Sequence, residues 1–348
     1  MKFDFSQLLG QNTAIILENP INIRYLTNCP IDDGFMIICE QGKFLLVDDR
    51  YLLDAKTQDD TQVVRLTSFN KQLPKLIEKF HVKRVLLEEK YVTLSRYNNY
   101  LNILPKINVD LTSSVSNYLL NMRAKKMPDE IKKIKEAQRL ADEAFAYIVD
   151  YVKPGVTEKE IAVKLEQKLL ELGSEGRAFD FIVVSGERTA IPHGKPTERE
   201  IKDGDFVTID FGAKVDGYSS DMTRTLAIGK IDDEKREVYN IVLNAQKKAI
   251  DNIKPGITGG KIDEIAREHI TEYGYGKFFT HSLGHGVGLD IHELPRLFKG
   301  SNDVLQVGSI VTVEPGIYMP GKFGIRIEDM ILITENKIEN LTGFTKDI

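Results

Sequence analysis

Short apolar strands alternate with amphipathic helices over roughly the first third of the chain. Five runs of β-branched and aromatic residues have strand character, and three stretches have helical spacing. The expected strands are Thr13–Glu18, Gly34–Glu40, Lys43–Asp48, Gln62–Thr67 and Arg84–Glu89. The expected helices are Arg50–Lys56, Asn70–Phe80 and Leu94–Leu104. This alternation predicts a separate α/β domain over residues 1–120.

The pattern changes after this domain. Residues 121–130 form a predicted linker, because Pro128 followed by two acidic residues suits the first turn of a helix. Residues 131–348 then contain two similar halves. Lys153-Pro-Gly-Val-Thr157 recurs as Lys254-Pro-Gly-Ile-Thr258, with helical patterns on either side of each turn. Such a repeat predicts an α+β domain whose halves pack about a pseudo-two-fold axis.

Each half also contains an expected β-hairpin with two acidic residues. In the first, Val207–Val215 and Tyr218–Ile228 are joined by Asp216-Gly217, a strong signal for a type I′ turn. Pairing Val215 with Tyr218 places Gly212 opposite Asp221. Asp210 then lies diagonally across from Asp221 on the same face.

The second hairpin repeats this arrangement. Gly308-Ser-Ile-Val-Thr-Val-Glu-Pro-Gly316 echoes Gly204-Asp-Phe-Val-Thr-Ile-Asp-Phe-Gly212, with Glu314 in the place of Asp210. The partner strand Gly324–Thr334 contains Glu328, and the loop Met319–Gly324 centres on Gly321. Glu314 and Glu328 are therefore expected to face each other. Clustered carboxylates repel unless a cation lies between them, so we predict a divalent-metal site.

Histidines are concentrated beside these hairpins. His281, His285 and His292 lie in a glycine-rich segment before the second hairpin, and His193 occupies the matching region of the first half. Four carboxylates with one or two imidazoles suit Mn²⁺, Co²⁺, Fe²⁺ or Zn²⁺ better than copper, Mg²⁺ or Ca²⁺. Four acids could neutralise two such ions, which lie roughly 3.5–4 Å apart in two-metal hydrolases.

Composition excludes several other functions. The formal net charge is −5, so no basic surplus points to nucleic acid as a partner. The two cysteines, Cys29 and Cys39, supply neither a disulfide framework nor a thiolate metal site. The N-terminus lacks a long apolar run, and no stretch is long enough to span a membrane. We therefore expect a soluble cytoplasmic protein.

The acids and histidines lie in motifs that resemble the pita-bread metallopeptidases, in particular Xaa-Pro aminopeptidases (aminopeptidase P) and Xaa-Pro dipeptidases (prolidases). These motifs are Ile191-Pro-His-Gly194, His281-Ser-Leu-Gly-His285 and Val313-Glu-Pro-Gly316, together with Asp210, Asp221 and Glu328. The resemblance covers nearly the whole chain. It implies a pita-bread catalytic domain behind a creatinase-like N-terminal domain, two divalent ions (Mn²⁺ first, with Co²⁺, Zn²⁺ or Fe²⁺ as alternatives), and a homodimer.

The resemblance also implies a role for each residue. Asp210 would chelate one ion, His285 and Glu314 the other, and Asp221 and Glu328 would bridge both. A hydroxide shared by the ions would attack the Xaa-Pro carbonyl while Glu314 shuttles protons. His193 and His292 would contact the substrate near the scissile bond. His281 and Arg326 would lie behind the ligands, with Arg326 orienting Glu328. Phe179 and Ile291 would line the apolar wall around the proline ring.

The length of the peptide substrate is the open point. Arg296, in His292-Glu-Leu-Pro-Arg296, stands where prolidases use an arginine to bind the proline carboxylate. Asp48-Asp-Arg-Tyr51 instead resembles the aminopeptidase P pattern. We expect an Xaa-Pro aminopeptidase, with an Xaa-Pro dipeptidase as the alternative.

Four further alternatives share part of this evidence. Methionine aminopeptidase has the same ligands, but the preceding α/β domain and the context of His193 and His292 favour the proline-directed branch. Creatinase and non-catalytic pita-bread modules lack ligands that this chain keeps. A dinuclear phosphoesterase would need the same acids, but the chain has no Gly-rich phosphate loop.

Overall fold

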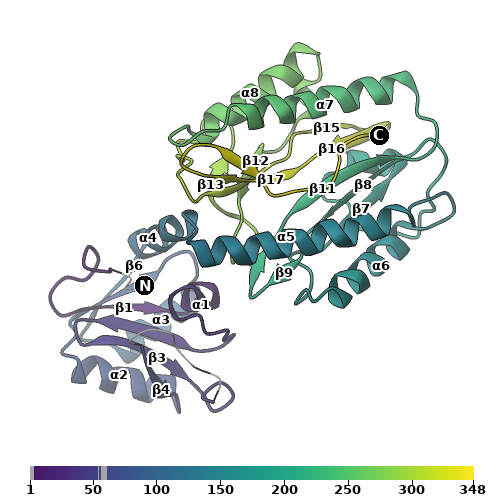
Figure 1. Ribbon diagram of the computed structural model, residues 1–348. Helices are drawn as coiled ribbons and strands as arrows, with labels where there is room; N and C mark the ends of the chain where they lie inside the picture. Colours follow the sequence, from purple (N-terminus) through teal and green to yellow (C-terminus); the bar gives the residue numbers. More distant parts are fainter. Residues whose placement is uncertain (1–3, 54, 56–60) are drawn as a thin grey trace. The chain divides into compact units, whose positions relative to one another are not determined.

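The computed structural model describes residues 4–53, 55 and 61–348. The chain divides into two compact units, Met1–Met122 and Arg123–Ile348 (Figure 1). Among the described residues, no helix combines the length and apolar character needed to cross a bilayer.

A six-stranded mixed sheet forms the centre of the N-terminal unit, in the order β4-β3-β2-β1-β5-β6. Its strands are β1 (Thr13–Leu17), β2 (Phe35–Cys39), β3 (Gly42–Val47), β4 (Gln62–Arg65), β5 (Arg84–Glu88) and β6 (Asn108–Thr112). The helices are α1 (Pro20–Thr27), α2 (Phe69–Lys79), α3 (Leu94–Ile103) and α4 (Ser113–Ala124). Alternate residues of β1 enter separate cores: Ala14 and Ile16 pack on one face, Ile15 and Leu17 on the other. Both faces are therefore buried, as in other α/β sheets.

The structure corrects one predicted element of this unit and adds three. The expected helix Arg50–Lys56 is not formed, because residues 50–53 are turn residues; residues 54 and 56 lie outside the described part. The Asp48 carboxylate accepts the Arg50 N–H at 2.9 Å and the Asp48 carbonyl accepts the Leu52 N–H at 3.1 Å, so the segment forms a single turn at this point. Helices α1 and α4 and strand β6 were not predicted.

The C-terminal unit contains two helix pairs and four small sheets. The helices are α5 (Pro128–Val149), α6 (Glu158–Glu171), α7 (Asp233–Asp251) and α8 (Gly259–Glu272), with short 3₁₀ turns at Gly186–Ala190 and Gly276–Phe278. The predicted linker 121–130 includes the end of α4 and the start of α5. Thr157 and Glu160 form the expected capping box of α6, and Thr258 caps α8 in the same position of the second half.

The strands of the two halves lie between these helix pairs (Figure 1). The first half contains the sheet β11-β8-β7 and the pair β10-β9. Its strands are β7 (Ile182–Ser185), β8 (Phe206–Phe211), β9 (Lys214–Val215), β10 (Tyr218–Ser219) and β11 (Met222–Ala227). The second half contains the sheet β13-β12-β14-β17-β18 and the pair β15-β16. Its strands are β12 (Gly284–Gly286), β13 (Glu293–Leu297), β14 (Ile310–Val313), β15 (Gly316–Met319), β16 (Phe323–Arg326), β17 (Asp329–Ile333) and β18 (Ile338–Asn340).

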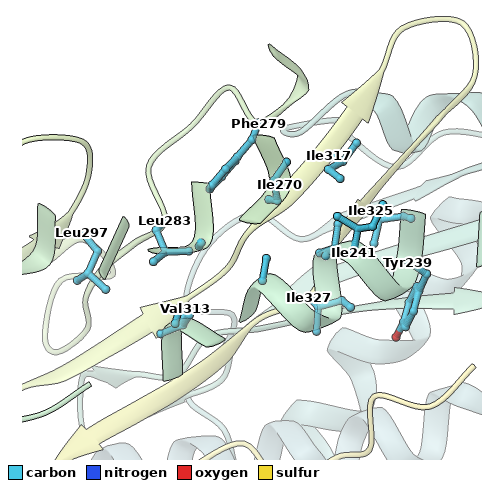
Figure 2. Close-up of a cluster of buried hydrophobic side chains, with 14 of the residues drawn as sticks. Tyr239, Ile241, Ile270, Phe279, Leu283, Leu297, Val313, Ile317, Ile325 and Ile327 are labelled. Carbon is cyan, nitrogen blue, oxygen red and sulfur yellow. The ribbon is translucent and has the colours of Figure 1, made fainter. Parts of the chain in front are cut away.

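Each half buries its own core between helices and strands. Figure 2 shows part of the second, where Tyr239 and Ile241 of α7 and Ile270 of α8 meet the strands. Val313 and Ile327, which directly precede two of the predicted metal ligands, are fully buried in this cluster. Close packing therefore fixes the backbone from which Glu314 and Glu328 project.

Candidate metal centre

The first hairpin has the predicted register. Val215 pairs with Tyr218, and Asp216 and Gly217 both have positive φ, at 46° and 75°. Further along, Asp210 pairs with Thr223 and Phe211 with Met222, so Asp221 is the diagonal neighbour of Asp210. Both carboxylates therefore point to one face, as predicted.

The strands of this hairpin are interrupted where they were expected to be continuous. The breaks fall at residues 212–213 and 220–221, between β8/β11 and β9/β10. The Ser220 hydroxyl accepts the Ala213 N–H at 3.0 Å, taking a bond that a regular ladder would use. A Cβ on Gly212 would lie 1.8 Å from the Ser220 carbonyl oxygen. The local distortion thus requires glycine beside the metal-site acids.

The second hairpin repeats this break. Val313 pairs with Asp329 and Gly316 with Arg326, so Glu314 and Glu328 lie opposite each other in the gap, as predicted. The loop is shorter than expected, because Met319 and Phe323 are still paired and only residues 320–322 connect the strands. In the second hairpin both acids thus lie in the break, whereas in the first hairpin Asp221 lies in the break and Asp210 is still paired within β8.

The acids of the two hairpins converge. Thr223 of the first hairpin donates its hydroxyl to Glu328 Oε2 of the second at 2.7 Å. Ligand atoms of Asp221, His285 and Glu328 lie within 4.8 Å of one another. His285 Nε2 is 3.7 Å from Asp221 Oδ2 and 3.4 Å from Glu314 Oε1. These contacts bring together Asp221, His285, Glu314 and Glu328, and Asp210 lies on the same hairpin face as Asp221.

A cavity of about 870 Å³ opens onto this cluster. Every candidate residue lines it: the ligands Asp210, Asp221, His285, Glu314 and Glu328, the neighbours His193, His281, His292 and Arg326, and the substrate-site candidates Phe179, Ile291 and Arg296. Its size is within the range of small-molecule and peptide sites in proteins.

Burial and mutual repulsion shift the ionisation of these groups. Burial, followed by the charge of Glu328, raises the pKa of Asp221 well above its ordinary value. Burial likewise raises the pKa of Glu328 strongly and that of Glu314 to about 8. Burial lowers the pKa of His285 to about 3, so its imidazole is neutral at pH 7 and able to bind a metal.

The donor atoms fit divalent cations. Among the described residues, Asp210 Oδ1 and Asp221 Oδ1 are buried side-chain oxygens without a hydrogen-bond partner. An unpaired buried carboxylate oxygen is costly, and a cation removes that cost. Four carboxylates and one neutral imidazole suit Mn²⁺, Fe²⁺, Co²⁺ or Zn²⁺.

Arg326 contacts a different ligand from the one predicted. Its Nη2 donates to Asp210 Oδ2 at 2.6 Å, not to Glu328, while Nη1 donates to the Tyr318 hydroxyl at 2.8 Å. Strand alternation fails here because β16 ends at Arg326 and β17 begins at Asp329, so residue 328 lies in the break. Arg326 thus orients an acid of the other hairpin.

Three neighbours of the ligands were missed by sequence reasoning. Thr223 binds Glu328, as described above. The Thr312 hydroxyl donates to Glu314 Oε1 at 3.1 Å and accepts the His285 N–H at 3.0 Å. The Tyr318 hydroxyl lies 2.9 Å from His281 Nε2. The hairpin count could have found Thr223, since it pairs directly with Asp210; nothing in the pattern singles out Thr312 or Tyr318.

The remaining histidines occupy different positions around the ligands. His281 is held between Tyr318 and the Ser282 carbonyl oxygen, 2.7 Å from its Nδ1, and burial lowers its pKa to about 4. The His292 ring lies 4.3 Å from that of His285, centroid to centroid. His193 is exposed to the cavity on the segment 191–194.

Comparison with known proteins identifies this arrangement. Residues 132–335 match the model of metallopeptidase family M24, and residues 11–125 match the creatinase/prolidase N-terminal domain. The chain belongs to metallopeptidase family M24. Its fold is accordingly the pita-bread fold behind a creatinase-type N-terminal domain, as predicted, and the M24 family uses divalent metal ions.

Individual relatives cover almost the whole chain. An Xaa-Pro dipeptidase of Pyrococcus furiosus is 37% identical over 96% of this chain and 94% of its own length. The solved structure of an Xaa-Pro dipeptidase from Bacillus anthracis has a TM-score of 0.93 at 39% identity, covering 96% of this chain and 94% of its own. The solved structure of an X-Pro aminopeptidase from Thermotoga maritima has a TM-score of 0.90 at 37% identity, and it covers 99% of this chain and 98% of its own. This M24 protein is thus a metallopeptidase of the prolidase and X-Pro peptidase type.

Proposed function

We propose that this M24 protein hydrolyses the Xaa-Pro bond at the N-terminus of peptides, as an Xaa-Pro aminopeptidase. The observation that carries the proposal is the convergence of Asp210, Asp221, Glu314 and Glu328 with the neutral His285 in one cavity. The names of the similar proteins support the choice of an Xaa-Pro bond.

The site would hold two divalent ions, which we propose to be Mn²⁺. Asp210 would bind one ion, His285 and Glu314 the other, and Asp221 and Glu328 both. When bound, such a pair lowers the pKa of water to near neutrality and polarises the carbonyl under attack.

The chain's own groups would move protons and place the substrate. Glu314, held by Thr312 at 3.1 Å, would take a proton during attack and return it to the departing proline nitrogen. His193 and His292 would donate hydrogen bonds to the substrate around the scissile bond and stabilise its developing charge. His281 and Arg326, linked through Tyr318, would keep Asp210 in place. Phe179 and Ile291 would pack against the proline ring.

The alternative is an Xaa-Pro dipeptidase, and one observation favours it. Arg296 lines the cavity, and within the described residues its guanidinium makes no ion pair. A free guanidinium there could bind the carboxylate of a C-terminal proline. A peptide extended beyond proline would lack that carboxylate at this position.

Parallel assays of Ala-Pro and Ala-Pro-Ala separate the two functions. We expect the protein loaded with Mn²⁺ to hydrolyse Ala-Pro-Ala, with Ala-Pro as a secondary substrate. Hydrolysis of Ala-Pro alone would establish the dipeptidase instead. Arg296→Met should then lose Ala-Pro turnover selectively. We also propose a homodimer, which sedimentation equilibrium would test.

A further inference from the structure

A buried cluster of charges directly follows the cavity-lining residues Ile291 and His292 in the chain and contains none of the proposed ligands. Glu293 stands at its centre, at the start of β13. Arg123 Nη2 lies 2.6 Å from Glu293 Oε1, and Lys126 Nζ lies 2.9 Å from Glu293 Oε2. Arg123 Nη2 also contacts Asp290 Oδ2 at 2.7 Å. The side chains of Arg123, Lys126 and Glu293 are only 1–2% exposed.

The Glu293 carboxylate also holds its own chain segment. Its Oε1 accepts the Asp290 N–H at 3.0 Å, closing a turn over residues 290–293. The Gly288 N–H donates to the Asp290 carbonyl at 3.0 Å, and the Gly288 carbonyl accepts the Ser219 N–H at 2.8 Å. A Cβ on Gly288 would lie 2.5 Å from Glu293 Oε2. Hydrogen bonds therefore hold both ends of this turn, residues 288–293: those of Gly288 at one end and those of the Glu293 carboxylate at the other.

The turn carries two residues that face the cavity. Ile291 and His292 both line it, and the His292 ring packs edge-on against His285. They lie between the anchored Asp290 N–H and the anchored Glu293 carboxylate. Displacement of either anchor would move both side chains.

Stability alone does not explain three buried charges here. Desolvating an ion pair costs about as much as its attraction returns, and apolar replacements of similar volume are often no less stable. Burial by itself would raise the pKa of Glu293, but Lys126 and Arg123 hold it below its ordinary value. The carboxylate is therefore ionised, and its fixed charge gives the turn a defined orientation.

We propose that Glu293, clamped by Arg123 and Lys126, is a positioning residue that sets the orientation of His292 and Ile291 toward the substrate. This inference rests on the proposed function only for the roles of His292 and Ile291. The clamp itself is a property of the fold and has its own readout.

A double-mutant cycle tests the positioning. In the Mn²⁺-loaded protein, Glu293→Gln should lower kcat/KM for Ala-Pro-Ala about 10- to 100-fold, because small misplacements of catalytic groups cost this much. In a background that carries both His292→Ala and Ile291→Ala, the same substitution should change kcat/KM less than about threefold, since the effects of coupled residues are not additive. Metal content should stay at the wild-type value. Equal effects in both backgrounds, or loss of metal, would overturn the inference.

Hydrogen exchange tests the clamp without relying on catalysis. Amides of residues 286–293 should exchange at least about tenfold faster in Glu293→Gln than in the wild type. The same increase is expected in Lys126→Met, a milder variant that keeps the Arg123–Glu293 pair and can be used if Glu293→Gln does not fold. Asp205→Asn is the matched control: it breaks the Arg199–Asp205 ion pair of 2.7 Å but should leave exchange at 286–293 unchanged. Wild-type exchange in both clamp variants would refute the clamp. Absence of Xaa-Pro hydrolysis in the wild type would instead refute the proposed function.

Discussion

Arg326 binds one oxygen of Asp210 at 2.6 Å, while the other oxygen of Asp210, among the described residues, is buried without a hydrogen-bond partner. The arginine thus fixes the rotation of a carboxylate that keeps one oxygen available for a cation. Arg326→Lys keeps the charge but cannot reach Asp210 and Tyr318 together. We expect Mn²⁺ affinity to fall about 10- to 100-fold. Calorimetric titration measures this, with Arg296→Lys as the control in the same cavity. Equal Mn²⁺ affinity in both variants would contradict the role of Arg326.

Thr223 offers a test on the opposite hairpin. Thr223→Val keeps the shape but removes the hydroxyl that donates to Glu328 Oε2 at 2.7 Å. We expect about tenfold weaker Mn²⁺ binding, because ligand orientation is lost. Thr208→Val is the matched control, since among the described residues the Thr208 hydroxyl bonds to the Thr225 hydroxyl at 2.9 Å and to none of the proposed ligands. A similar loss of Mn²⁺ affinity in both variants would show that the effect is not specific to Glu328.

The buried acids make the stability of the metal-free protein depend on pH. Burial raises the pKa of Glu314 to about 8 in the folded protein. The protonated Glu314 therefore contributes fully to stability at a pH below its pKa in the unfolded chain, and this contribution is lost as the pH rises through about 8. The lowered pKa values of His281 and His285 act in the opposite direction, but only below about 6.5.

Between pH 6.5 and 8, therefore, the free energy of unfolding should fall by about 1 kcal/mol per pH unit for each such acid. Urea unfolding after metal removal measures the slope. Glu314→Gln should reduce it, and saturating Mn²⁺ should abolish it. A free energy of unfolding that rises between pH 6.5 and 8 would contradict the burial of these acids in their protonated form.

Gly212 tests the interrupted hairpin. In Gly212→Ala the new Cβ would lie 1.8 Å from the Ser220 carbonyl oxygen, so the two strands must separate at the level of Asp221. We expect a loss of about 1–3 kcal/mol in unfolding free energy together with weaker Mn²⁺ binding. Gly321→Ala is the comparison: it has φ of +75° but no neighbour within 4 Å, so it should lose stability without losing metal affinity. If Gly212→Ala binds Mn²⁺ normally, the close approach does not shape the site.

The sequence was most informative where a turn determines register. Asp216-Gly217 specifies a two-residue turn, and counting from it places Asp210, Gly212 and Asp221 correctly. The repeat then transfers this register to Glu314 and Glu328. Helices with clear caps, such as that after Thr157, were equally accessible.

The sequence was least informative where tertiary contacts decide. Alternation assigned Arg326 to Glu328, but the break at residues 327–328 turns the arginine toward Asp210 of the other hairpin. In the predicted helix Arg50–Lys56, residues 50–53 form turns, and the sequence pattern did not distinguish these turns from a regular helix. Glu293 meets Arg123 across 170 residues of sequence, a contact that no local pattern encodes.

Turnover of Ala-Pro-Ala by metal-depleted protein, followed as Mn²⁺ is added, tests the central claim most directly. If the two hairpins form the metal site, the rate of hydrolysis should be negligible without metal and should reach its maximum at two Mn²⁺ per chain. Asp221→Ala should show no hydrolysis at any Mn²⁺ concentration. Turnover that does not depend on Mn²⁺, or full activity in Asp221→Ala, would contradict a metal centre built from these acids.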